Sequence, residues 1–393
     1  MKKITLISAL FAAAFSMNAA PLVTIGDQLD LFFKGEVSGT WNSNITYRNQ
    51  DKVNDYSAVF RLGGELDYGR NSKFKANVKF LENLTRFAER KEFNSNLASL
   101  FATASYTESQ WKVLADFSFV QNYQNTSTTT QANASGDLVR SDIYNAGING
   151  TYDFTEKFYG ELGFRWYSIQ YQGMWGDLYS DLDTYSVPVS ILYRVTEKIS
   201  AGLSYTYRYT EFSGGNLFNS LYYGNSRSDH SVGVTVRGQL LPKLNALLYG
   251  GWVYRDPQGG LDPSTSESES TFALRAELGY ELTEKIGLFA IATRDFGSGA
   301  QRQISLNTGC EVGANYAITS YLTATTSFSY TNAEYQQSDD REDDIYIARV
   351  GLSYIPNKFI KISANYRYYN NASNLEAAAY NQHLVDLTFA LRY

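Results

Sequence analysis

The sequence predicts an all-β fold, a transmembrane antiparallel up-and-down β-barrel of about eighteen strands, with sixteen strands as the alternative. Three observations lead to this prediction. Alternate residues are apolar along much of the 393-residue chain, short polar turns recur at regular intervals, and the first residues are typical of an export signal. Because only every second residue of such a strand would face lipid, the mean hydropathy can be as low as −0.33 in a membrane protein.

A secretory signal peptide is predicted over residues 1–20. Lys2 and Lys3 form its charged start, and Ile4–Phe15 is an apolar stretch too short to cross a bilayer as a helix. We expect export by the Sec pathway, removal of this segment, and a single barrel domain over residues 21–393. Loss of the two lysines would change the formal net charge from −6 to −8, which argues against nucleic acid as a partner.

Polar turns determine the predicted number of strands. The tripeptide Thr-Glu-Lys occurs at 155–157, 196–198 and 283–285, each time between two alternating stretches. Five degenerate counterparts complete the set: Gly69–Ser72, Thr107–Gln110, Leu241–Lys243, Thr319–Ser320 and Pro356–Lys358. Eight turns define sixteen strands, and Leu31–Tyr47 before the first turn and Asn381–Tyr393 after the last loop add two more.

Short turns are expected on the periplasmic side and long connections on the extracellular side. Six outer loops are polar and irregular: 125–140, 173–183, 213–229, 257–270, 336–344 and 372–380. The loop 125–140, which is the third outer connection along the chain although it is the first of these six, would either fold inward to narrow a channel or lie on the surface. Aromatic residues near strand ends, such as Trp111, Tyr193 and Tyr47, are expected to form belts at the two membrane interfaces.

Charged side chains occupy the phase opposite to the apolar residues, so we expect them to face a water-filled lumen. The predicted pore-lining residues are Arg61, Glu65, Lys75, Asp116, Glu161, Arg165, Arg194, Arg208, Arg237, Arg275, Glu277, Glu311, Arg349 and Arg367. An Arg or Lys on the lipid side at mid-membrane would cost about 2–4 kcal/mol, which explains the shared phase. Any one of them could instead pair across strands and support the wall. A barrel of about eighteen strands is too wide for side chains to fill.

Catalysis, a cofactor and a metal are not expected. The two histidines, His230 and His383, fall at the outer starts of different strands and no nucleophile motif surrounds them. One acidic loop is a weak candidate for holding Ca²⁺ or Mg²⁺ against lipopolysaccharide phosphates, and a solvated loop is the alternative. Its carboxylates are Asp339, Asp340, Asp343 and Asp344.

The final strand carries a resemblance to a known class of proteins. Val385, Leu387, Phe389, Leu391 and Tyr393 alternate up to a terminal aromatic residue. In this the chain resembles bacterial outer-membrane β-barrels, whose last strand ends in an aromatic residue that the barrel-assembly machinery reads. The resemblance implies a bacterial outer-membrane location among lipid and lipopolysaccharide. It also implies that Phe389, Leu391 and Tyr393 serve as an assembly signal.

A second likeness concerns one hairpin. Tyr193-Arg194-Val195-Thr196-Glu197-Lys198, followed by Gly202-Leu203-Ser204-Tyr205, is similar to the β-barrel porins linked to exopolysaccharide export. We expect a porin-like channel for passive diffusion of small hydrophilic solutes or saccharides, with a homotrimer among the assemblies considered. A conduit of an exopolysaccharide export system and a structural or adhesive barrel are the alternatives. No plug is expected, because only about ten residues separate the signal from the first strand.

Overall fold

The structure is a computed structural model that describes residues 21–125, 138–215, 221, 224–261, 267–299, 302–336 and 341–393. Residues 1–20, where the sequence predicts a signal peptide, lie outside the described residues. No helix in the described ranges is long and apolar enough to cross a membrane.

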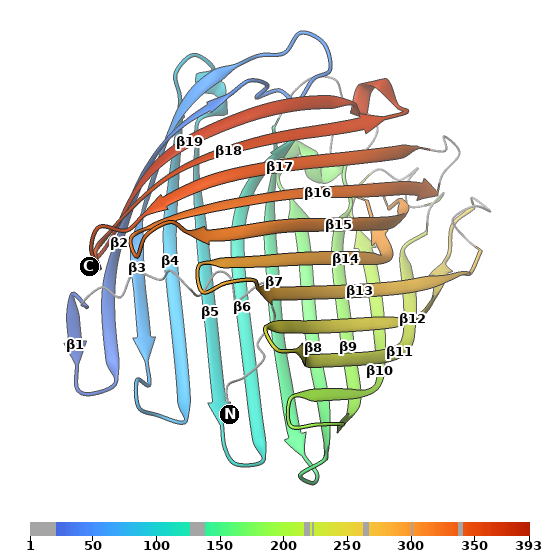
Figure 1. Ribbon diagram of the computed structural model, residues 1–393. Helices are drawn as coiled ribbons and strands as arrows, with labels where there is room; N and C mark the ends of the chain where they lie inside the picture. The colour runs from blue at the N-terminus through green and yellow to red at the C-terminus, as the bar shows by residue number, and fades with distance from the viewer. Residues whose placement is uncertain are drawn as a thin grey trace.

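Nineteen strands in the described part of the chain form one antiparallel sheet, and β2 to β19 close it into a barrel (Figure 1). Each strand from β2 onward pairs with the next in sequence. The last strand, β19, then pairs with β2, from Leu384 opposite Asn42 to Arg392 opposite Lys34. The predicted up-and-down barrel of eighteen strands is therefore confirmed, and the alternative of sixteen is wrong.

The strands lie at β1 (Val23–Ile25), β2 (Leu29–Asn42), β3 (Asp55–Tyr68), β4 (Phe74–Phe87), β5 (Ser95–Thr107), β6 (Trp111–Asn125), β7 (Leu138–Asp153), β8 (Phe158–Tyr171), β9 (Asp181–Arg194), β10 (Ile199–Ser213), β11 (Ser226–Leu241), β12 (Leu244–Gln258), β13 (Glu269–Glu281), β14 (Ile286–Ser298), β15 (Ile304–Ala317), β16 (Leu322–Gln336), β17 (Glu342–Tyr354), β18 (Ile360–Ser373) and β19 (Tyr380–Arg392). Short 3₁₀-helices lie in the longer connections: η2 (Lys91–Phe93), η4 (Gly173–Asp177) and η5 (Glu376–Ala378).

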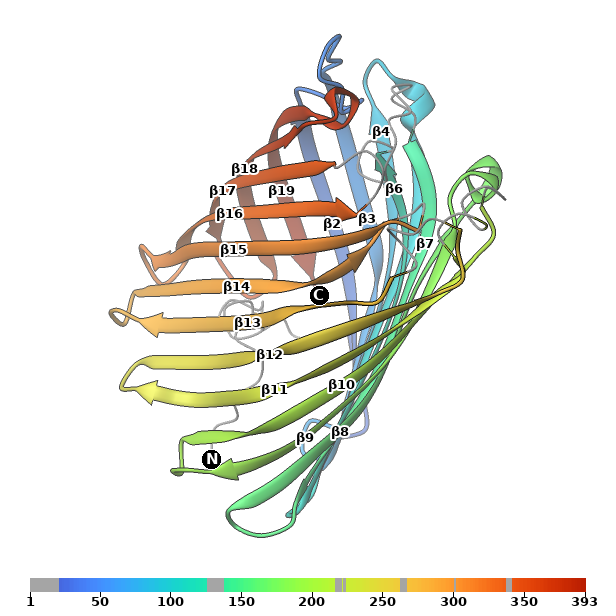
Figure 2. The ribbon, with the colours of Figure 1, turned by 90° about the vertical axis from the view of Figure 1, so that its right-hand side faces the viewer.

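The eight predicted turns all join consecutive strands, and they gather at one end of the barrel while the longer connections lie at the other (Figures 1 and 2). Five of these turns in the described chain share one local structure. A side-chain oxygen accepts hydrogen bonds from the backbone N–H groups two and three residues further on, at 2.9 to 3.2 Å. The accepting residues are Thr155, Thr196, Thr283, Thr319 and Asn357. The repeated threonine is therefore explained by turn chemistry, because its hydroxyl satisfies backbone donors that the ladder leaves free.

The outward face of the wall is apolar. Leu162, Leu203 and Leu387 are 61%, 67% and 61% exposed, and residues of the same phase along their strands are apolar as well. Aromatic rings pair on this face near both ends. Trp111 and Tyr152 lie 4.4 Å apart near the short turns, and Tyr330 and Tyr346 lie 5.2 Å apart near the long connections, measured between ring centroids. This arrangement suits a bilayer core bounded by two interfaces.

The first barrel strand is shorter than predicted, which removes one residue from the outer aromatic belt. β2 ends at Asn42, five residues before the predicted end at Tyr47. Tyr47 lies in the following connection with a φ of 54°, and its ring packs edge-on against Tyr380 with 5.5 Å between centroids. Its place in the belt is therefore a wrong prediction: the chain leaves the sheet before reaching it.

The short strand β1 covers part of the barrel's seam, the line along which β19 meets β2. Its residues Val23, Thr24 and Ile25 pair with Leu31, Asp30 and Leu29 at the inner end of β2. Further along the same strand, Tyr393 exchanges two backbone hydrogen bonds with Phe33, and β19 runs on from there. β1 thus lies where β19 has ended, and it supplies partners to backbone groups of β2 that would otherwise lack them.

Candidate functional site

The lumen is the candidate functional site, because the barrel directs its charged side chains inward. On β3, Arg61 lies between Phe60 and Leu62, which are 39% and 48% exposed on the opposite face. Contacts between strands that are not neighbours identify the inner side, since they can form only across the concave surface. The Arg237 guanidinium on β11 reaches Glu161 on β8 at 2.6 Å, and so both side chains lie in the lumen.

Most of the predicted pore-lining residues lie in ion pairs within the described residues. Arg61 pairs with Glu36, Arg194 with Asp153 and Arg275 with Glu277. The pairs with longer contacts are Arg165 with Asp116 at 3.8 Å, Arg208 with Asp229 at 2.6 Å, Arg349 with Glu311 at 3.2 Å, and Glu65 with Lys34 at 2.5 Å and Arg392 at 3.1 Å. The alternation therefore predicts which face of the wall carries the charged side chains. The ion pairs, which the sequence left as an alternative, show how those side chains are held. Their role in permeation stays a prediction.

Two predicted residues differ from the others. Among the described residues, Lys75 and Arg367 have neither a carboxylate nor a hydrogen-bond partner. Arg367 on β18 lies directly opposite Arg349 on β17 in the strand register, and Arg349 already contacts Glu311. Two like charges side by side leave Arg367 as an uncompensated cation on the lumen wall.

Near the end of the barrel that carries the short turns, one tyrosine contacts two arginines. The Tyr159 ring centroid lies 4.6 Å from the Arg194 guanidinium carbon and 5.5 Å from that of Arg237. Arg237 also donates from Nη2 to the Tyr159 hydroxyl at 3.0 Å and to Glu161 at 2.6 Å. These contacts join β8, β9 and β11 across the inner surface. They fix the guanidinium planes, so the wall presents charge in set positions.

The seam carries a comparable group. Arg392 on β19 donates from Nη2 to Glu65 and to Asp67, both at 3.1 Å and both on β3. Its guanidinium carbon lies 3.7 Å from the Phe32 ring centroid on β2. This side chain of β19 thus contacts β2, its partner at the closure, and β3 beyond it, which ties the end of the chain to its beginning.

One hairpin separates from its neighbour on one side and bends inward, while β15 stays paired with β16 as far as Ile304 opposite Gln336. We call residues 295–299 and 302–306 the β14–β15 tip. Pairing between β13 and β14 ends at Leu274 opposite Arg294, although β13 continues outward to Glu269. Beyond that point, side chains of the tip are buried against the inner face of β12 and β13. The cluster consists of Phe296, Ile304 and Leu306 from the tip with Val253 and Ala273 from the wall.

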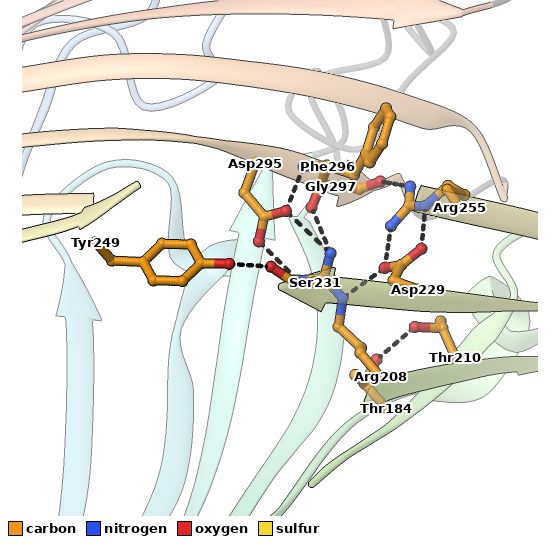
Figure 3. A network of polar contacts seen from close by, with 10 residues as sticks. All are labelled: Thr184, Arg208, Thr210, Asp229, Ser231, Tyr249, Arg255, Asp295, Phe296 and Gly297. Carbon is orange, nitrogen blue, oxygen red and sulfur yellow. Dashed lines mark hydrogen bonds and ion pairs between the residues drawn. The ribbon is translucent and has the colours of Figure 1, made fainter. Parts of the chain in front are cut away.

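Charged contacts accompany this apolar cluster (Figure 3). Arg208 donates from Nη1 to Asp295 of the tip at 2.9 Å and from Nε to Asp229 at 2.6 Å. Arg255 donates to both oxygens of Asp229, at 2.6 and 2.7 Å, and from Nη1 to the Gly297 carbonyl at 2.9 Å. The tip is therefore held to β10, β11 and β12, which lie well away from β14 along the wall.

Arg302 provides the furthest-reaching contacts of the tip. It is 2% exposed and has a φ of 70°. Its guanidinium donates to the Ser180 hydroxyl at 2.8 Å, to the Gly214 and Gly224 carbonyls at 2.9 Å each, and to the side chain of Asn225. Because burial disfavours the charged form, the pKa of Arg302 is lowered from its usual value.

Sequence reasoning missed this tip. The loop considered for folding inward, 125–140, lies mostly outside the described residues, since positions 126–137 are not described. The β14–β15 connection is short and has no acidic run or unusual length to mark it. Its only local signals are the glycines at 297 and 299 beside Asp295 and Arg302. Its contacts come from two distant connections, β8–β9 and β10–β11, and from side chains of β10 and β12, which no local pattern reveals.

The candidate metal loop is only partly within the described residues. Asp339 and Asp340 lie outside them. Asp343 accepts hydrogen bonds from Arg341 at 2.9 and 2.5 Å, and Asp344 accepts one from the Tyr330 hydroxyl at 2.7 Å. No group of three or more metal-binding side chains occurs among the described residues. The two described carboxylates are therefore engaged by protein donors.

The two histidines occupy matching places on the outward face. His230 Nδ1 lies 2.8 Å from the Tyr205 hydroxyl, and His383 Nδ1 lies 2.9 Å from the Tyr366 hydroxyl. Each ring also packs against a second tyrosine, Tyr207 or Tyr368. These are aromatic contacts near the outer interface, and each histidine contacts tyrosines of the neighbouring strand.

Residues 246–393 match the family model described as "Putative beta-barrel porin 2". The match covers less than half of the chain and begins after the hairpin at 193–205 that carried the likeness in the sequence. This part of the chain is therefore similar to that family. The closed barrel, with its apolar outer face and charged lumen, agrees with the likeness. No curated protein matches this chain.

Several crystal structures are similar to this porin-like barrel along most of its length. OccK5 (OpdH) of Pseudomonas aeruginosa is 11% identical, with a TM-score of 0.46 over 93% of this chain and 98% of that one. OccAB3 of Acinetobacter baumannii is 10% identical, with a TM-score of 0.48 over 94% and 100%. OpdL of Pseudomonas aeruginosa is 12% identical, with a TM-score of 0.45 over 94% and 99%. At such identities no residue role is carried over to this chain.

Proposed function

We propose that the barrel is an outer-membrane porin through which small hydrophilic solutes diffuse passively. The observation that carries this proposal is the division between the two faces of one closed wall. The outward face is apolar, and the inward face carries ion pairs from strands all around the barrel. A barrel of this size has room for water between its walls, and charged groups keep that space hydrated.

The arrangement of charge suggests how solutes pass. Most fixed charges are compensated by a partner, so the lumen offers donors and acceptors without a large field of one sign. A solute can exchange part of its hydration for these groups at many weak positions, which permits both entry and exit. The uncompensated cations Lys75 and Arg367 add a modest preference for anions. No reaction or energy source enters this mechanism.

Insertion of the purified mature chain into planar lipid bilayers tests the proposal. We expect discrete conductance steps in salt solution, and swelling of liposomes that contain the protein when small sugars are added outside. The control is the same preparation after heat denaturation, which should give neither signal. A correctly folded barrel without conductance or sugar uptake would contradict the channel and favour a structural or adhesive role. Passage of long polysaccharide chains would favour an export conduit.

The proposed assembly of the porin uses its last strand. Phe389 and Tyr393 lie on the outward face and are 46% and 48% exposed, with Leu391 on the same phase. We propose that these three side chains are read by the barrel-assembly machinery. An outward-facing signal is available to another protein until lipid covers it, and this supports the role. A homotrimer remains a proposal, and chemical cross-linking of the barrel in its membrane tests it.

A further inference from the structure

We propose that Arg302 is the positioning residue that holds the β14–β15 tip inside the barrel and thereby sets the width of the channel in its outer half. The inference rests on the proposed channel function and assigns its narrowing to one side chain. The tip here means residues 295–299 and 302–306, as defined above.

The tip occupies the lumen at the expense of ladder contacts. Ser270 to Ala273 on β13 have ladder partners on β12, and the described ladder between β13 and β14 ends inward of them, at Leu274 opposite Arg294. The hairpin formed by β16 and β17 behaves differently, because its ladders with both neighbours continue to the outer end, at Gln336 opposite Ile304 and at Asp343 opposite Ser373. Unpaired backbone at the edge of β13 must be offset by other contacts, so the inward position of the tip needs a specific fastening.

The side chain of Arg302 makes such contacts between the tip and the wall. Its guanidinium donates to acceptors on two connections of the wall: Ser180 between β8 and β9, and Gly214, Gly224 and Asn225 between β10 and β11. All four acceptors are neutral, and in the described residues Arg302 makes no ion pair. The planar group satisfies several fixed acceptors together, which a lysine ammonium with its compact charge would not reproduce.

The backbone of Arg302 supports the same conclusion. A φ of 70° belongs to the left-handed region, which glycine adopts readily and residues with long side chains adopt rarely. Arg302 also accepts a hydrogen bond at its own carbonyl from Arg227 Nη2 at 2.8 Å, and both guanidiniums lie near the Phe212 ring. The side chain of Arg302 therefore contacts neutral acceptors on the wall, and its main-chain carbonyl contacts Arg227 on β11.

The test compares single-channel conductance of the wild-type barrel with that of Arg302→Ala, Arg302→Lys and Arg294→Ala. Arg294 is the matched control, because it lies on the same hairpin and its hydrogen bond to Thr308 stays within that hairpin. Barrel folding is followed separately by heat-modifiable gel mobility. We expect Arg302→Ala to raise conductance severalfold and to admit larger sugars into liposomes. Arg302→Lys should resemble the alanine variant more than the wild type, and Arg294→Ala should match the wild type.

The outcomes separate this inference from the channel itself. If the wild type conducts and the folded Arg302→Ala barrel has the same conductance, the role of Arg302 is overturned and the porin proposal stands. Absence of conductance in both overturns the porin proposal. If Arg302→Ala does not fold, Ser180→Ala removes one acceptor outside the hairpin, and it should raise conductance in the same direction by less. An unchanged Ser180→Ala channel would then count against the inference.

Discussion

Two arginines in the inner half of the lumen and two arginines at the β14–β15 tip are held in different ways. Near the short turns, Arg194 and Arg237 each contact a carboxylate on another strand of the wall. Arg302 on the tip and Arg227 beside it are 2% and 3% exposed, and within the described residues neither makes an ion pair, unlike the nearby Arg208 and Arg255. Paired arginines stabilise a fixed wall. Buried arginines held by neutral acceptors join two parts that the strand ladder does not connect, and their cost of desolvation leaves that junction easier to separate.

The largest effect is expected from Asp229→Asn. The Asp229 carboxylate is 2% exposed and contacts both Arg208 and Arg255. Removing its charge leaves the buried Arg255 guanidinium without an anion and Arg208 with Asp295 alone, and breaking a buried pair in this way costs about 3–5 kcal/mol. We expect the tip to leave its place and conductance to rise.

Asp153→Asn is the matched change in the inner half. Its side chain is 35% exposed and pairs with Arg194 at the wall, far from the tip. Conductance should stay near the wild-type value in this variant. Equal conductance changes for the two substitutions in bilayer recordings would remove the distinction between the two regions.

Arg227→Met should act in the opposite direction. Arg227 Nη1 is buried and has no hydrogen-bond partner among the described residues. A buried charge without an ion pair carries a desolvation cost, and an apolar side chain of similar length removes that cost. Methionine loses the bond to the Arg302 carbonyl but keeps contact with Phe212. We expect a tip that is docked at least as firmly, seen as fewer fluctuations in the open-channel current. Noisier traces would show that the Arg227 charge itself holds the tip.

The smallest effect on stability is expected from Arg367→Glu. This side chain has no partner to lose in the described structure, so the free energy of unfolding should change by less than about 0.5 kcal/mol. Its charge faces the lumen, and reversal also places a carboxylate opposite Arg349. The reversal potential in a salt gradient should therefore move toward cation preference. An unchanged reversal potential would place Arg367 away from the path of the ions.

Sequence reasoning succeeded where structure is local. Alternation along each strand predicts which face is wet, and a threonine at the start of a turn marks the hairpin, because both depend on residues within a few positions. Ion-pair partners were not predictable in the same way, since Arg237 reaches past two strands to Glu161. The tip shows the limit most clearly. On the alternation of β14, Phe296 shares the outward phase of Leu288, yet its ring is buried beside Val253 inside the barrel.

The seam has a mechanical consequence. β19 meets β2 only from Leu384 to Arg392, whereas β2 meets β3 along its full length from Leu29 to Asn42. It is also the ladder that joins the two most distant parts of the sequence, so its closure must wait until the last strand is in place. β1 extends the seal by three residues, and the Arg392 contacts reinforce it from inside. We expect this line to be where the wall parts first when the barrel is pulled or heated.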